Sequence, residues 1–143
     1  MAAMSLGLVA LCEVLRAKTH LEVFVGRPDE EVPGVHVWAW GLYEDVNVKN
    51  LRRPVASDAE GTGNAGASPV LRVLVLVRPA HTLEGLARFC AVREVLLAMP
   101  ILDVDGSRVR VTISSMEVDQ LSRLFIAAAL PLSLCLSVEL RWA

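Results

Sequence analysis

The spacing of apolar residues along the chain distinguishes helical from extended segments. Apolar positions three or four residues apart predict helices over residues 4–17, 83–99 and 115–130. Short apolar or alternating runs predict strands over residues 21–25, 35–44, 70–78, 107–113 and 133–142. This order, α-β-β-loop-β-α-β-α-β, predicts an α/β (α+β) fold with a mixed, mainly antiparallel sheet flanked by about three helices.

Cap residues and apolar stripes define the two later helices. Thr82 is the expected N-cap of the second helix, and the capping-box spacing of Ser114 and Glu117 predicts that Ser114 caps the third. The second helix is expected to bury a stripe of apolar residues, namely Leu86, Cys90 and Leu97, aided by Leu83, Phe89 and Leu96. The third is expected to bury Val118, Leu121, Leu124, Phe125 and Ala128.

The strand over residues 35–44 is apolar on both faces, which predicts a central strand covered on two sides. Trp38 and Trp40 share one face, where core or interface packing is favoured over stacking on a sugar or a base. Ala39 and Gly41 lie on the other face, and their small size would let a helix approach the sheet closely.

The two strands near the C-terminus, 107–113 and 133–142, each alternate between apolar and polar residues. Because each exposes one face, we expect them to supply an edge for pairing with a neighbouring subunit. The Asp-Gly at the end of segment 103–106 predicts a hairpin-like turn. A calcium loop beginning at Asp103 would need an acidic twelfth residue, where the chain has Ser114.

The chain has the length of a single domain, residues 1–143, with a flexible, glycine-rich loop over residues 55–69. The loop glycines resemble a phosphate-binding loop in number alone, since no Lys-Ser/Thr pair follows them. Apolar residues make up 54% of the chain, which excludes an intrinsically disordered protein. The mean hydropathy of +0.48 is high for a small monomer and suggests that other subunits cover some apolar surface.

Charge and cysteine content narrow the possible partners and compartments. The net charge of −2 argues against a nucleic-acid-binding protein and against a basic membrane-surface protein. Cys12, Cys90 and Cys135 are far apart and are expected to be buried, reduced thiols. The longest uncharged run, residues 124–138, is too short to span a membrane, and no basic residue precedes the apolar N-terminus. We therefore expect a cytoplasmic product without direct membrane insertion.

The sequence contains no recognisable catalytic, metal-binding or cofactor-binding motif. His20, His36 and His81 lack metal-ligand spacing, and no serine lies in a nucleophile elbow. We therefore expect no catalytic residues, no metal and no cofactor, and do not expect an enzyme. The candidate interface residues are basic: Lys49, Arg52, Arg53, Arg108, Arg110 and Arg141. They would meet acidic partners. The alternative for the first three residues is a solvated turn, and the alternative for the last three is that their charges protect a strand edge.

Three stretches of the chain carry a family resemblance. The first, VHVWAWGLYEDVNVKNLRRP, runs from a strand into a corner, and the second is VLRVLVLVRPAHTLEGLARFCAVREVLLAMPIL. The third, VRVTISSMEVDQLSRLFIAAALPLSLCLSVELRWA, joins a strand, a helix, a proline turn and a final strand. Their order is similar to that of the cap, or tail-terminator, proteins of extracellular contractile injection systems of the antifeeding-prophage and virulence-cassette type.

The resemblance implies a tail-terminator-like domain and a structural role. It implies a homohexameric ring at the distal end of the inner tube and the sheath of a phage tail-like particle, where it stops polymerisation. The implied partners are further copies of this chain, the tube protein and the sheath protein, with no nucleic acid. Two alternatives stay open: another phage-tail-like assembly or connector protein, and a small-molecule-binding regulatory α/β domain.

Overall fold

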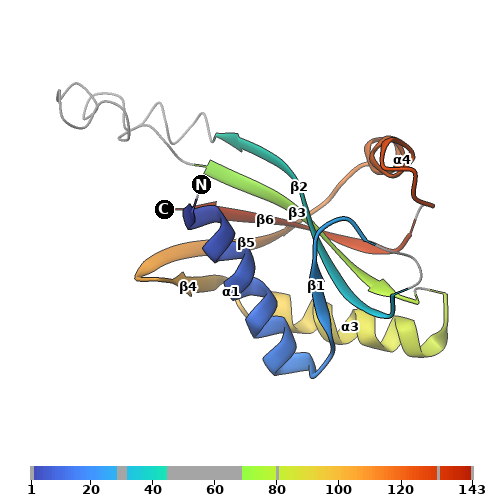
Figure 1. Ribbon diagram of the computed structural model, residues 1–143, viewed down its shortest axis with the longest axis horizontal. Coiled ribbons are helices and arrows are strands. Elements are labelled where there is room, and N and C mark those ends of the chain that lie inside the picture. The colour runs from blue at the N-terminus through green and yellow to red at the C-terminus, as the bar shows by residue number, and fades with distance from the viewer. Residues whose placement is uncertain (1, 29–31, 45–68, 80, 132, 143) are drawn as a thin grey trace.

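A computed structural model describes residues 2–28, 32–44, 69–79, 81–131 and 133–142 of the chain (Figure 1). Within this part of the chain, three helices and six strands follow one another: α1 (Ala2–Thr19), β1 (Val23–Val25), β2 (Gly34–Glu44), β3 (Pro69–Arg78), α3 (Leu83–Leu97), β4 (Ile101–Val104), β5 (Ser107–Ser114), α4 (Val118–Ala127) and β6 (Cys135–Trp142). The predicted loop over residues 55–69 lies outside the described residues, except for Pro69.

The six strands form one sheet in the order β1-β2-β3-β6-β5-β4. β1 pairs with β2 in parallel, and the other neighbours are antiparallel. The predicted mixed, mainly antiparallel sheet is therefore confirmed. The sequence pattern missed β4, which pairs with β5 across the predicted turn. Asp105 and Gly106 have φ values of 49° and 83°, as a tight Asp-Gly hairpin turn requires.

The predicted position of the sheet edges is wrong. β1 and β4 are the outer strands, whereas β5 and β6 lie inside the sheet. Alternation between apolar and polar residues shows that one face of a strand meets solvent, but it carries no information on whether the strand has a neighbour on both sides. A strand with one solvent-exposed face and a strand at the sheet edge both carry exposed polar side chains, so the pattern does not distinguish them.

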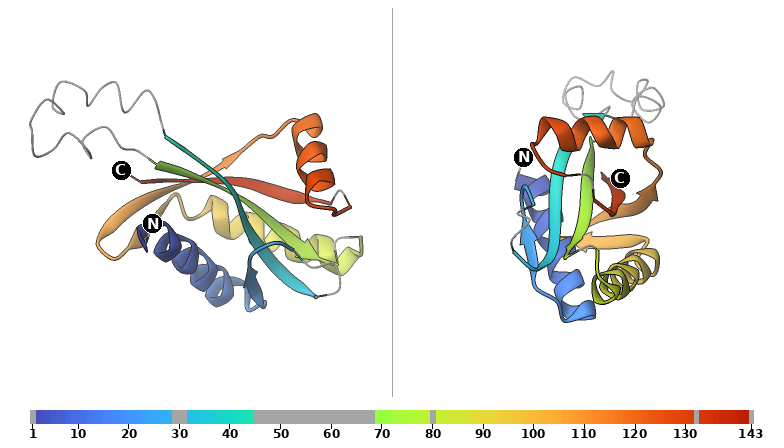
Figure 2. Two further views of the ribbon diagram at one scale, coloured as in Figure 1. Left: turned by 45° about the horizontal axis from the view of Figure 1, so that its top comes forward. Right: turned by 90° about the vertical axis from the view of Figure 1, so that its right-hand side faces the viewer.

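The helices cover the two faces of the sheet unequally. α1 and α3 lie on one face, and α4 crosses the other near one end (Figure 2). α1 contacts α3 and also both outer strands, β1 and β4, so the sheet curls around it. β3 supplies side chains to both layers: Val73, Val75 and Val77 belong to the core under α1 and α3, while Leu74 and Leu76 pack with Phe125 under α4.

The buried side of α3 differs from the prediction. Leu86 and Leu97 are 46% and 54% exposed, and Leu83 is 89% exposed. Of the predicted residues, Leu96 is buried and Phe89 is half-buried against the core, and the other buried residues are Gly85 and Val92. α3 has apolar residues on two sides, so periodicity identified a real stripe but could not decide which side faces the sheet. The predicted cap is confirmed, since the Gly85 backbone N–H donates to Thr82 Oγ1 at 2.9 Å.

α4 begins later than predicted and is not capped by Ser114. Its N-cap is Glu117, which makes no capping hydrogen bond through its side chain. Ser114 is the last residue of β5, where pairing of its strand with β6 outweighs the local capping pattern. Phe125 is buried as expected, with Leu121 and Leu124 packed beside it, but Val118 is 71% exposed because it occupies the first position of the helix.

A bulge in β2 separates the two small residues that were expected to share a face. The register with β3 shifts between Ala39 and Gly41, which places Gly41 opposite Arg72. Ala39 packs with the core under α1 and α3, whereas Arg72 alternates with Val73 toward the face that carries α4. Trp38 and Trp40 both pack in the core under α4, which confirms the packing interpretation for these side chains.

Candidate interface surface

Four arginines lie together on the sheet face that α4 covers in part. β3 contributes Arg72, β5 contributes Arg108 and Arg110, and β6 contributes Arg141. Residues of the same strands that alternate with them, such as Val109, Val111 and Leu140, are buried on the opposite face. We call the four arginines, together with Glu139 between them, the arginine face.

Strand register fixes the neighbours within the arginine face. Glu139 on β6 lies opposite Arg72 on β3, and Arg141 lies opposite Arg110 on β5. Arg108 lies opposite Asp103 on the outer strand β4. The arginine face therefore extends across three neighbouring strands, β3, β6 and β5, and Asp103 on β4 borders it.

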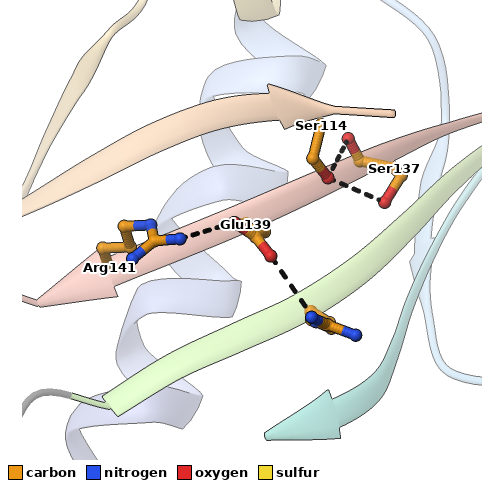
Figure 3. A network of polar contacts seen from close by, with 5 residues as sticks. Ser114, Ser137, Glu139 and Arg141 are labelled. Carbon is orange, nitrogen blue, oxygen red and sulfur yellow. Dashed lines mark hydrogen bonds and ion pairs between the residues drawn. The ribbon is translucent and has the colours of Figure 1, made fainter. Parts of the chain in front are cut away.

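Glu139 is held by two of the arginines (Figure 3). Its carboxylate lies 2.9 Å from the Arg141 guanidinium and 3.5 Å from Arg72 Nε. The Glu139 side chain is 12% exposed, while those of Arg72 and Arg141 are 35% and 31% exposed. The Arg72 guanidinium also lies 5.6 Å from the centre of the Trp40 ring, within cation–π range. These contacts fix the two inner guanidinium groups against the sheet.

A small polar recess lies between the arginine face and α4. Its volume is about 70 Å³, and it is lined by Trp40, Arg72, Ser114, Ser115, Met116, Gln120, Ser137 and Glu139. At its wall, the hydroxyls of Ser114 and Ser137 are 3.0 Å apart (Figure 3). Buried Trp40 Nε1 has no hydrogen-bond partner among the described residues.

The structure brings together half of the predicted interface residues. Arg108, Arg110 and Arg141 share the arginine face, although their use as an interface stays a prediction. Lys49, Arg52 and Arg53 lie outside the described residues. Sequence analysis missed Arg72 and Glu139, and the available signal was a charged residue in the middle of the apolar run VLRVLVLV.

The buried His36 makes its contacts within the fold. His36 is buried and stacks on Phe24 with 5.4 Å between the ring centres. Its Nε2 lies 2.9 Å from the Val32 carbonyl oxygen.

In the part of the chain that the structure describes, no three His, Cys, Asp or Glu residues cluster as metal ligands. None of the described helices is long and apolar enough to cross a membrane.

The three cysteines occupy different environments. Burial raises the pKa of Cys12 and of Cys135 to about 11, so both thiols are held in the neutral form. Cys90, by contrast, is exposed on α3. The expectation that all three are buried is confirmed for Cys12, while Cys135 is half-buried. It is wrong for Cys90, which belongs to the apolar stripe of α3 that faces away from the sheet.

Comparison with known proteins finds similarity in the fold and not in the sequence. No protein family and no curated protein matches the sequence. The fold is similar to that of the sheath/tube terminator of an extracellular contractile injection system, PVC, in its extended state. The TM-score is 0.69 with 14% identity, over 97% of this chain and 55% of that one.

The fold is also similar to that of the anti-feeding prophage cap, a tube terminating cap. Here the TM-score is 0.68 with 17% identity, over 94% of this chain and 52% of the cap. The chain thus spans about half the length of the two proteins that it matches. The expected likeness to caps and terminators of contractile injection systems is confirmed at the level of the fold.

Proposed function

We propose that this chain is a structural terminator that caps the end of the inner tube and the sheath of a phage tail-like contractile injection particle. The observation that carries the proposal is the similarity of 97% of the chain to a sheath/tube terminator. An arbitrary small α/β domain has no reason to share the fold of a terminator over nearly its whole length. We infer a structural and not a catalytic role.

A terminator acts by presenting surfaces to the subunits that it stops. Such a subunit needs a rigid scaffold and surfaces complementary to its neighbours. The curled sheet, with a helix layer on one face and α4 on the other, supports the first requirement. The arginine face supports the second. We further propose a closed ring of six copies, a number that follows from the family resemblance, assembled in the cytoplasm of the producing bacterium as part of the particle.

Electron microscopy of particles from cells with and without the gene tests the capping role. We expect particles of uniform length with a closed end when the gene is present. Deletion should give overlong or unstable tubes, and a plasmid copy of the gene should restore uniform length. Particles of unchanged length with intact ends in the deletion strain would refute the proposal.

Native mass spectrometry of the purified chain tests the proposed ring separately. A closed ring gives one dominant oligomer whose mass is a multiple of the 15.5 kDa chain, with few intermediates. A monomer at all accessible concentrations would refute self-assembly of this chain. That result would not test binding to the tube and the sheath, which the microscopy addresses.

A further inference from the structure

The arginine face carries more positive charge than its own carboxylates neutralise. Among the residues that the structure describes, two carboxylates face the four guanidinium groups: Glu139 lies between Arg72 and Arg141, and Asp103 lies opposite Arg108. The whole chain has a net charge of −2. The positive charge on this face is therefore a local concentration and does not follow from the overall composition.

This concentration has an energetic cost in the isolated subunit. Arg110 lies directly opposite Arg141, and like charges in a cross-strand pair destabilise a sheet, although the ion pair of Arg141 with Glu139 offsets part of this repulsion. Arg108 and Arg110 are exposed and, within the described residues, form no ion pair. An external carboxylate would relieve the repulsion at this position.

We propose that the arginine face binds an extended acidic segment of a partner protein through its carboxylates. Arg108 and Arg110 are two residues apart on β5, which separates their attachment points by about 7 Å. Acidic residues at alternate positions of an extended peptide have the same spacing, and guanidinium groups bind carboxylates through two parallel hydrogen bonds. Ile101, next to Arg110 on β4 and 48% exposed, adds an apolar contact.

A polypeptide fits this face better than a nucleic acid does. Glu139 and Asp103 interrupt the positive charge, so a continuous phosphate backbone would meet two carboxylates. Bases stack on exposed aromatic rings, whereas Trp40 is partly buried and lies next to Arg72.

The inference deepens the proposed function, because it names the chemistry of one contact that a terminator makes, and it rests on that function. Peptide binding by the purified chain needs no particles, so the two proposals fail separately. Binding together with unchanged particles in the deletion strain would retain the arginine face and reject the terminator. Defective particles in the deletion strain, without peptide binding by the purified chain, would retain the terminator and reject the arginine face as a peptide-binding surface.

Fluorescence anisotropy with a labelled 12-residue peptide of alternating Glu and Thr tests the proposal. The control probes are the matching Gln-Thr peptide and a labelled single-stranded DNA oligonucleotide. The test variant is Arg108→Glu/Arg110→Glu. The matched control is Arg93→Glu/Arg123→Glu, which makes the same charge change at two exposed arginines on α3 and α4.

The wild-type chain should bind the Glu-Thr peptide, and this binding should weaken as salt is raised. The test variant should bind about 100-fold more weakly, because each lost charge-assisted contact accounts for about tenfold. The control variant should keep wild-type affinity. Arg110→Glu removes a like-charge pair, but Arg108→Glu places a second carboxylate opposite Asp103, so the melting temperature of the test variant is measured as well. The single variant Arg110→Glu should melt at or above the wild-type temperature and bind about tenfold more weakly, so that weaker binding cannot be attributed to unfolding.

Three results would overturn the proposal. The first is absence of wild-type binding to the Glu-Thr peptide at low salt. The second is equal binding by the wild-type chain and the Arg108→Glu/Arg110→Glu variant, which would place the contact elsewhere. The third is binding of the DNA oligonucleotide as tight as binding of the peptide, which would identify a general polyanion surface.

Discussion

Two adjacent leucines at the end of α3 test which side of this helix faces the sheet. Leu96 is 2% exposed and belongs to the core under α1 and α3, whereas Leu97 is 54% exposed. The perturbation is the same in both cases, Leu96→Ala and Leu97→Ala. Leucine and alanine have similar helix propensities, so the difference between the two variants measures burial.

The expected free energies of unfolding follow from these exposures. Replacing a fully buried leucine by alanine removes its transfer free energy and leaves a cavity, at a cost of about 3–5 kcal/mol. Leu97 has only about half of its surface to lose and leaves no enclosed cavity, so about 1 kcal/mol is expected. Leu96→Ala should therefore cost at least about 2 kcal/mol more than Leu97→Ala.

Urea denaturation followed by circular dichroism measures both costs. Equal slopes of free energy against urea in the three proteins are required for the comparison. The protein should be dilute enough to be monomeric, because burial of Leu97 between copies would raise its cost. Equal costs at the two positions in monomeric protein, or a larger cost for Leu97→Ala, would show that α3 presents the opposite side to the sheet.

Two further predictions concern backbone packing and thiol chemistry. Gly85→Ala should cost about 3 kcal/mol or more in urea denaturation, because a Cβ there would lie 1.9 Å from the Pro79 carbonyl oxygen; a stability within 1 kcal/mol of wild type would contradict this close approach. At pH 8 a thiol-specific reagent should modify Cys90 quickly, and Cys12 and Cys135 only slowly. With pKa values of about 11 the two buried thiols are only about 0.1% ionised at that pH, so their reaction should accelerate as the pH rises toward 11. Fast reaction of a second thiol besides Cys90 in the folded protein would contradict the shielding of Cys12 and Cys135.

The strands could be predicted well because burial on two sides leaves a strong pattern. The run 70–78 is apolar on both faces, and the structure uses both, with Val73 under α1 and α3 and Leu74 under α4. β4 was missed because it has four residues and is recognised through pairing with β5, which alternation within one segment does not record. The order of the strands in the sheet could not be predicted either, because it too depends on which segments pair with each other.

The helices show where local patterns fail. Apolar residues on two sides of α3 leave two possible orientations, and contact with the sheet selects the one that buries Leu96. At α4, Ser114 satisfies the capping-box spacing, yet pairing with Ser137 on β6 extends β5 through this residue. In both places a contact distant in sequence decides the outcome, and at Ser114 it outweighs a capping preference worth about 1 kcal/mol.

The arginine face could be predicted only in part, since alternation assigns each arginine to a face but not to a neighbour. Register determines the neighbours, and the buried residues determine the register. A slip of one residue between β5 and β6 would turn Val109 and Val111 away from the core under α1 and α3. The core thus holds Arg110 opposite Arg141 despite their repulsion. A substitution such as Arg110→Glu would remove that repulsion without disturbing the core, so the like-charge pair is not a requirement of folding. An acidic partner of the arginine face, as proposed above, would give this pair a role that the stability of the isolated subunit does not.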